Sequence, residues 1–442
     1  MNMNKQGLNH GIGALQWLVF LLANAVALPI VIGQVFHLPD PDIAGLMQRT
    51  FFIVGISSFL QGWLGHRFPI VDGPAGTWLV VFIIMGETAV RTGANVSETL
   101  QLLESGMIAA GVLLILFGVT GLVRRMLPLF TPLVSGVYLL LLALQVSGTF
   151  LQGMAGVSGN PAKADWTSAL LALLVFSTVL VLSFRGKGWV KSYAVLIGIL
   201  TGCVAFYLAG IWKHPDPAET LLQVPEALAW GAPLWDPGMA ASSILIVMIL
   251  LSNTFASIAA MKQVQTGTPG LEPAELSRSS VVGGFSHLLS ALFSTVGMVP
   301  LSGSAGFVRL TGQRSSVPFL LACLIMAASA FFPGVIRLLT MLPGPVAYAA
   351  VLASFVQMVG IGLQSLVQTQ LDQRRLTIIG IGLLFGVGSM FFPPSVFQEL
   401  PSVVRYTLGN GLLFGTMIVM GLEQVWREKR SDSQVMQGAA DK

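Results

Sequence analysis

Apolar runs of about 20 residues recur from one end of this chain of 442 residues to the other, and a helix needs about that length to cross the hydrocarbon core of a bilayer. Only 10% of the residues are charged, whereas an ordinary soluble domain has about 25%. So few charges cannot build a water-facing surface. The sequence therefore predicts an all-α polytopic membrane protein.

We interpret the runs as about fourteen membrane spans. They are 11–33, 43–64, 74–88, 105–123, 127–147, 168–184, 190–212, 239–261, 279–298, 301–313, 317–338, 343–364, 375–392 and 404–425. The third and tenth spans are short and broken by glycine, and we expect a short extended segment in each. Lys and Arg gather in the loops on the side of the N-terminus, as is typical of cytoplasmic loops. This bias predicts an inner (plasma) membrane protein with both termini in the cytoplasm.

Glycine- and proline-rich motifs recur in the same order in the two halves of the chain. Gly73-Pro74-Ala75-Gly76 follows the second span, and Gly303-Ser304-Ala305-Gly306 follows the ninth. Thr131-Pro132 opens the fifth span, and Gly344-Pro345 opens the twelfth. Seven spans separate each pair, and an odd number of spans inverts the second copy. We predict inverted repeats at 1–212 and 239–426, an outer loop at 213–238 and a cytoplasmic tail at 427–442.

The two broken spans are the candidate solute site. A helix that begins inside the membrane presents free backbone N–H groups and the positive end of its dipole. These groups can bind a polar solute without placing a full charge in lipid, as in transporters with paired broken helices. The alternative is that these glycines only permit close helix packing.

The remaining residues argue against other classes of protein. The five histidines are scattered without metal-ligand spacing, and no Walker, HExxH or GxSxG motif is present. Cys203 and Cys323 both lie within apolar runs, so no disulfide framework is indicated. The net charge of +4 is spread over short loops, unlike the basic patch of a nucleic-acid-binding protein. We expect no cofactor, no metal, no nucleic-acid partner and no enzymatic activity.

Several of these segments together resemble the nucleobase/ascorbate (xanthine/uracil) transporter family. The segments are Gln16-Trp17 followed by Leu28–Gly33, Pro69–Gly73, Gly303–Gly312, Pro343-Gly344-Pro345 and Phe355–Ile361. Their order and spacing carry the resemblance over nearly the whole chain. It implies fourteen spans, with a core domain of spans 1–4 and 8–11 and a gate domain of spans 5–7 and 12–14. It also implies a small nucleobase substrate (xanthine, hypoxanthine, urate or uracil) and often a homodimer in the bilayer.

The resemblance also implies a binding site where the first, third, eighth and tenth spans meet. The residues expected there are Gln16, Trp17, Ala75, Gly76, Ser252, Asn253, Phe255, Gly303 and Ser304. Backbone N–H groups near Gly76 and Ser304 would bind the base, and Asn253 or Ser252 would read its edge, because an amide offers both donors and an acceptor. Trp17 or Phe255 would stack on the flat ring.

The chain departs from the family where the family places titratable groups. Ser252 or Asn253 replaces the carboxylate that the family has in the eighth span. In the tenth-span signature, Gly303 replaces the family's Glu or Gln, and Ser304 replaces its Asn. Trp17 stands where the family has histidine. None of these side chains binds a proton near neutral pH. The sequence therefore predicts weak proton coupling, meaning either facilitated diffusion or coupling through another group.

Three ionisable residues are candidates for ion coupling, and each has an alternative. Asp72 could instead cap the short helix or face the cytoplasm, and His287 could instead be hydrogen-bonded between helices. Arg309 could instead extend its long side chain to the inner face. Two other functions stay open: a sulfate- or bicarbonate-type anion transporter of the same architecture, which needs a cation near the helix starts, and a non-transporting membrane sensor.

Overall fold

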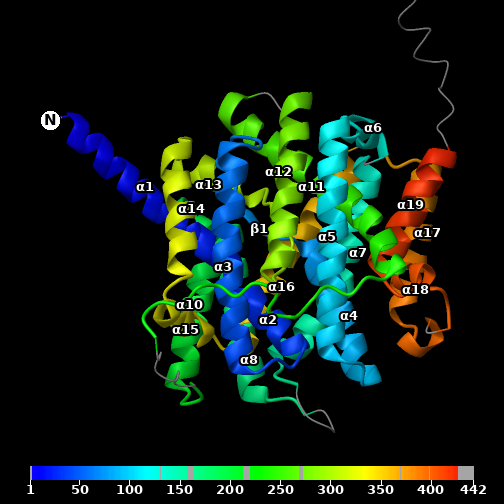
Figure 1. Cartoon of the computed structure of the whole chain (residues 1–442), viewed down its shortest axis with the longest axis horizontal. Helices are drawn as coiled ribbons and strands as arrows, with labels where there is room; N and C mark the ends of the chain where they lie inside the picture. Colours follow the sequence, from blue (N-terminus) through cyan, green and yellow to red (C-terminus); the bar gives the residue numbers. More distant parts are fainter. Residues whose placement is uncertain are drawn as a thin grey trace, which may run out of the picture.

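The computed structural model describes residues 2–129, 131–157, 163–212, 220–267, 272–368, 370–397 and 399–426. Within these ranges the chain is almost entirely helical (Figure 1). The predicted tail at 427–442 and the first part of the predicted outer loop, at 213–219, lie outside the described residues.

The first half of the chain contains one short strand and ten α-helices in its described part. They are α1 (Asn2–Ala25), α2 (Ala27–Val35), α3 (Asp40–Trp63), β1 (Asp72–Pro74), α4 (Gly76–Thr92), α5 (Val96–Thr120), α6 (Val123–Met126), the 3-10 helix η1 (Leu127–Leu129), α7 (Pro132–Met154), α8 (Trp166–Arg185), α9 (Trp189–Ser192) and α10 (Ala194–Leu208).

The second half repeats the pattern of long helices around one short strand. Its elements are α11 (Pro237–Thr266), α12 (Pro273–Leu292), β2 (Met298–Pro300), α13 (Gly303–Thr311), α14 (Ser316–Ser329), α15 (Pro333–Thr340), α16 (Gly344–Val367), α17 (Gln373–Met390), the 3-10 helix η2 (Pro394–Phe397), α18 (Ser402–Leu408) and α19 (Gly411–Val425).

Seven spans of the described chain are long and apolar enough to cross a membrane, one of them (His10–Val35) made of parts of α1 and α2. Two further helix pairs, α14 with α15 and α18 with α19, pass the same test together but bend by 90° at a short break, so the number rises to nine if each pair is one span. The chain is thus a multi-pass membrane protein. The prediction of fourteen spans goes beyond what these lengths and compositions establish.

Two helices begin before the predicted span starts, because charged residues lie inside the helices. The fourth span was expected to begin at 105, but α5 begins at Val96, where the Asn95 side chain accepts a hydrogen bond from the N–H of Ser97. The ninth was expected to begin at 279, but α12 begins at Pro273 with a capping box formed by Glu272 and Glu275. Helix-capping signals locate these starts better than hydropathy does.

The two short strands form an antiparallel pair in the interior of the protein. Asp72 lies opposite Pro300, Gly73 opposite Val299, and Pro74 opposite Met298. The pairing continues on both sides, since the Ala75 N–H donates to the Gly297 carbonyl and the Leu301 N–H to the Val71 carbonyl. Extended segments do therefore precede both short helices, and they are hydrogen-bonded to each other.

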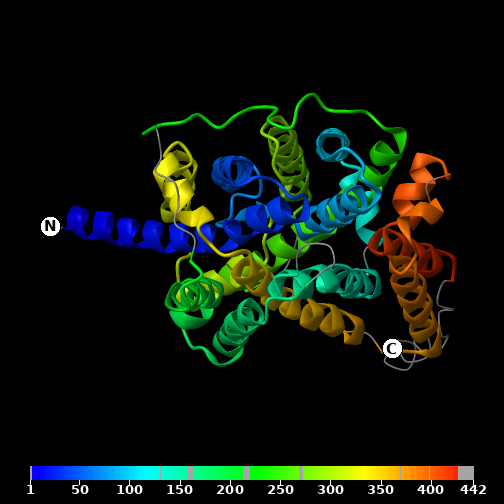
Figure 2. The ribbon, with the colours of Figure 1, turned by 90° about the horizontal axis from the view of Figure 1, so that it is seen from below.

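The long helices pack in two groups. In one group α5 packs on α12, and α3 and α1 both pack on α14. In the other, α7 and α8 pack on α16, and α17 packs on α19. In Figure 2, α3, α5, α12 and α14 lie along one side of the bundle, and α8, α10, α16 and α17 lie along the other.

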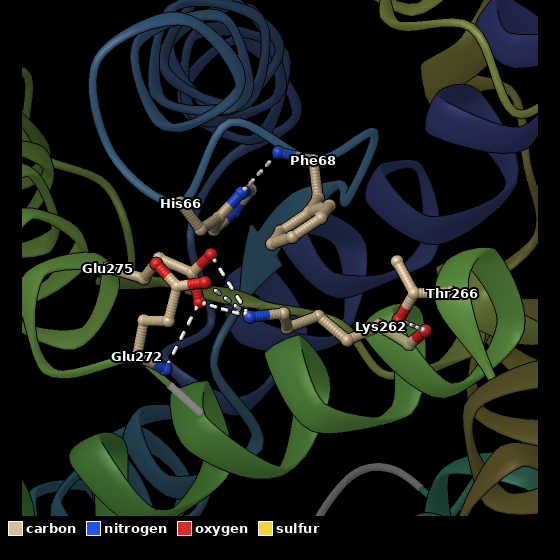
Figure 3. A network of polar contacts seen from close by, with 6 residues as sticks. All are labelled: His66, Phe68, Lys262, Thr266, Glu272 and Glu275. Carbon is tan, nitrogen blue, oxygen red and sulfur yellow. Dashed lines mark hydrogen bonds and ion pairs between the residues drawn. The ribbon is translucent and has the colours of Figure 1, made fainter. Parts of the chain in front are cut away.

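A polar network joins the end of α11 to the start of α12 (Figure 3). The ammonium of Lys262 lies 2.9 Å from Oε2 of Glu275 and 3.6 Å from Oε1 of Glu272. In the adjacent loop, the Phe68 N–H donates to Nδ1 of the buried His66. These ion pairs fasten the end of α11 to the start of α12.

Candidate functional site

Two helices begin inside the protein, each directly after a strand of the sheet. Neither Ala75, the N-cap residue of α4, nor Ser302, the N-cap residue of α13, makes a side-chain capping bond. Gly76 is partly exposed, and Ser302 and Gly303 are exposed. These starts can therefore offer N–H groups to an oxygen or nitrogen acceptor.

The free donors of α13 differ slightly from those predicted. The N–H groups of Ser304 and Ala305 already donate to the carbonyls of Leu301 and Ser302. The Ser304 hydroxyl is buried and accepts a hydrogen bond from the Val71 N–H at 3.0 Å. Ser304 thus ties α13 to the start of β1, and the N–H of Gly303 is the better-placed donor for a solute.

The start of α4 faces the second group of helices. A β-carbon on Gly76 would lie 3.8 Å from Leu142 of α7 and 3.8 Å from Met358 of α16. One residue on, the Thr77 hydroxyl lies 2.5 Å from the hydroxyl of Tyr138 on α7. A solute at the start of α4 would therefore lie against α7 and α16. Tyr138 was not predicted from the sequence, although a tyrosine within an apolar run is a visible signal.

The structure places Gln16 and Trp17 of α1 away from the start of α13. Oε1 of Gln16 accepts from the Gln313 amide, beyond the far end of α13. Trp17 is fully buried, with its ring 4.4 Å from that of Phe307 and 5.0 Å from that of Phe319.

The aromatic residue beside Gly303 is Phe20, whose Cζ lies 3.9 Å from a β-carbon built on that glycine. Phe20 lies one helical turn after Trp17. That spacing is the signal that sequence reasoning missed.

The predicted residues of α11 lie close to the sheet. The Ser257 hydroxyl donates to the Pro300 carbonyl at 2.8 Å, which fixes α11 on β2. Asn253 lies one turn earlier on the same helix face, is partly exposed and makes no hydrogen bond within the described part of the chain. Ser252 is partly exposed and Phe255 is buried. Asn253 is therefore the side chain of this group best placed to meet a solute.

The three candidates for ion coupling occupy different environments. His287 is buried, and its Nδ1 bonds to the Gly283 carbonyl of its own helix rather than to another helix as expected. Arg309 is exposed, six residues after the start of α13. Asp72 is fully buried and makes no capping bond to α4, so both alternatives named for it from the sequence were wrong.

Two cavities lie between the two groups of helices without reaching Gly76 or Gly303. One, of about 520 Å³, is lined by Glu87 and Arg91 of α4 and by Gln145, Arg405 and Asn410. The other, of about 680 Å³, lies between the end of α2, the starts of α3, α8 and α16, and α15. The two cavities lie along parts of the boundary between the two groups of helices. Between Thr77 and Tyr138 the two groups are in direct contact through their hydroxyls.

Comparison with protein families decides the class of this chain. The permease family model named Xan_ur_permease matches residues 9–395. The "Putative purine permease YwdJ" of Bacillus subtilis is 34% identical, over 96% of this chain and 98% of its own length. The chain belongs to the xanthine/uracil permease family.

Other members of the family are more distant. The "Uric acid permease PucK" of Bacillus subtilis is 24% identical, over 95% of this chain and 96% of its own length. The "Xanthine permease XanP" of Escherichia coli is 25% identical, over 92% of this chain and 90% of its own length. The family consists of transporters, which are not enzymes.

Solved structures share the fold at low sequence identity. The transmembrane domain of the cyanobacterial bicarbonate transporter BicA superposes with a TM-score of 0.61 at 15% identity, over 92% of this chain and 97% of that domain. The murine anion transporter Slc26a9, in its inward-facing state, superposes with a TM-score of 0.60 at 11% identity, over 96% of this chain and 69% of the other. At these identities the likeness shows the fold alone.

Proposed function

We propose that this permease carries a nucleobase, a purine such as xanthine, hypoxanthine or urate, or uracil, bound between the starts of α4 and α13. The observation that carries the proposal is the pair of helix starts held together by β1 and β2, with the start of α13 exposed and the partly exposed start of α4 facing α7 and α16. Free N–H groups suit the carbonyl oxygens and ring nitrogens of such a base. The names of the relatives, purine, uric acid and xanthine permeases, support this class of solute.

An anion transporter would need a fixed cation near the helix starts to bind its solute. The described part of the chain does not provide one there. The candidate was Arg309, which lies six residues into α13, about 9 Å along the helix axis from Gly303. The neutral residues Asn253 and Ser302 suit an uncharged polar ring better than an inorganic anion.

Transport by alternating access fits the packing. The proposed core consists of α1–α5 and α11–α15, and the proposed gate consists of α7–α10 and α16–α19. The core would move against the gate with the solute on its surface, and we expect both chain termini in the cytoplasm. The side-chain bonds between Thr77 and Tyr138 and between Glu87 and Thr149 cross this boundary, so they would break and re-form in each cycle.

Binding of radiolabelled xanthine, urate and uracil to the purified protein tests the function directly. Asn253→Ala should weaken binding about 5- to 150-fold, the loss expected when a polar contact worth about 1–3 kcal/mol is removed. The matched control is Thr254→Val, because the Thr254 hydroxyl bonds within its own helix to the Leu250 carbonyl. Absence of binding of all three bases would refute the proposed function, and an unchanged affinity in Asn253→Ala would refute the placement of the site.

A further inference from the structure

The carboxylate of Asp72 is enclosed at the point where the two broken spans meet. The residue lies in β1 opposite Pro300 and is 0% exposed. Its backbone is held by Ser58, whose hydroxyl accepts from the Asp72 N–H at 2.9 Å and lies 3.2 Å from its carbonyl oxygen. Neither carboxylate oxygen has a hydrogen-bond partner in the described part of the chain. The side chain is thus not used to hold the fold together.

The elements packed around Asp72 provide no cation in the described part of the chain. On α3 the neighbour is the Ser58 hydroxyl, and on α14 the Cys323 thiol is near enough to interact with the carboxylate electrostatically. β2 has no ionisable side chain, and α1 has none between Gly11 and Ala25. An ionised carboxylate in such surroundings costs several kcal/mol, whereas a protonated one does not carry this penalty.

Asp72 also lies beside the first turn of α13. The preceding residue, Val71, donates its N–H to the Ser304 hydroxyl and accepts a hydrogen bond from the Leu301 N–H. The positive end of α13 would stabilise an ionised Asp72 while its N–H groups are free. A solute acceptor at Gly303 would occupy those same groups and reduce that stabilisation. Binding of the solute and binding of a proton are then mutually favourable, and this coupling is reciprocal.

Buried polar side chains extend from Asp72 along the contact between α3 and α12, which we call the α3–α12 seam. The seam consists of Thr50, Ser57, Ser58 and Gln61 on α3, Ser279, Ser286, His287 and Ser290 on α12, and Thr295 just after α12.

The register of the seam is fixed at both ends. Near one end Gln61 and Ser279 exchange two hydrogen bonds, and near the other the hydroxyls of Thr50 and Thr295 lie 2.7 Å apart. In antiparallel packing this register places Ser57 level with Ser286. Both hydroxyls, together with Nε2 of His287, lack a partner among the described residues. Buried groups of this kind typically hold ordered water, and such water can pass protons.

We propose that Asp72 is the proton-binding site of this permease and that protons reach it through the α3–α12 seam. One proton from the outer solution binds the Asp72 carboxylate as the solute binds at α13, and both are released on the inner side. The inference rests on the proposed function for its solute. It replaces the weak coupling expected from the sequence, because the family's carboxylate position in α11 is neutral whereas a buried carboxylate stands on β1.

Two measurements on the full-length protein in proteoliposomes test the assignment. The first is the affinity for radiolabelled xanthine and urate between about pH 5 and pH 9. Linkage of one proton strengthens the wild-type affinity by up to about tenfold for each unit by which the pH falls. Asp72→Asn should bind with an affinity independent of pH, should not accumulate solute in an imposed proton gradient and should still exchange labelled for unlabelled solute. Asp165→Asn is the control, because it makes the same change at an exposed carboxylate at the start of α8, and it should behave as wild type.

The second measurement needs no solute. In the infrared difference spectrum between about pH 5 and pH 9, the carbonyl band of a protonated, buried carboxylic acid should be present in wild type and in Asp165→Asn and should be diminished by one carboxylic acid in Asp72→Asn. Asp72→Glu restores a carboxyl group and should restore the band and the pH dependence, which guards against a variant that merely misfolds. An undiminished carbonyl band, or retention of pH-dependent accumulation, in Asp72→Asn would overturn the assignment. If none of the bases binds, the proposed function fails, and the infrared band alone then decides whether Asp72 holds a proton.

Discussion

Gly303→Ala adds one methyl group at the start of α13 and should affect the binding of the solute without destabilising the fold. A β-carbon there would have one neighbour, Cζ of Phe20, at 3.9 Å, which is an ordinary van der Waals contact. Gly303→Ala therefore introduces no clash within the protein, and alanine favours the helix over glycine by about 0.5–1 kcal/mol. The thermal stability of the protein should be unchanged or increased.

The same methyl should interfere with the solute. If the base lies against the start of α13, the methyl occupies part of its space, and overpacking of this kind costs about 1–3 kcal/mol. The dissociation constant of the preferred base should then rise about 5- to 150-fold. Equilibrium binding of radiolabelled base to the purified variant measures this change, and a thermal melt of the same sample verifies that the variant is folded.

Gly306 provides a matched control one turn further along α13. It is also exposed, and a β-carbon there would have no atom within 4 Å. Gly306→Ala makes the same chemical change in the same helix, and its affinity should equal that of wild type. Equal affinities for Gly303→Ala and wild type would show that the base does not contact the start of α13.

Three further predictions concern movement and pH. Cross-linking Glu87→Cys to Thr149→Cys with a bifunctional thiol reagent should abolish uptake and preserve binding, because these side chains bond across the proposed core–gate boundary; uptake that survives complete cross-linking would contradict the division. Tyr138→Phe removes the hydrogen bond to Thr77, which is worth about 0.5–1.5 kcal/mol, and should broaden the distribution of distances between spin labels on α4 and α7. An unchanged distribution would show that this bond does not hold α4 against α7. Burial lowers the pKa of His66 to about 3, so below about pH 6.5 the unfolded chain binds a proton that the folded protein does not. The free energy of unfolding should therefore fall by up to about 1.4 kcal/mol per pH unit as the pH falls from about 6.5 towards 3. His66→Asn should flatten this dependence of the free energy of unfolding on pH.

Sequence patterns located the broken spans because their signals are local. Glycine and proline at 73–76 and 303–306 interrupt apolar runs, and the structure has a short strand followed by a helix at both places. Pro132 and Gly344-Pro345 were likewise predicted to open helices, and α7 and α16 begin at these residues. Each of these features depends on the backbone preferences of a few consecutive residues.

The partners of the site residues could not be predicted in the same way. Ser304 was expected to bind the solute through its backbone, but its hydroxyl and N–H are both used within the protein. Its bond partner Val71 is 233 positions away in the sequence, and a single sequence contains no record of such a contact. Trp17 was likewise expected to stack on the solute. Only the packing shows that Phe307 and Phe319 cover its ring, while Phe20 lies beside Gly303.

The pairing of β1 with β2 determines where the protein can move. The ladder from Val71 to Ala75 is closed by buried backbone hydrogen bonds, so separating the starts of α4 and α13 would leave several of these groups without partners in an apolar interior. By contrast, the two side-chain bonds between α4 and α7 are each worth only about 1 kcal/mol. The two helix starts should therefore move together as one body, carrying the solute and Asp72 with them, and relative movement should occur where α4 meets α7 and α2 meets α16.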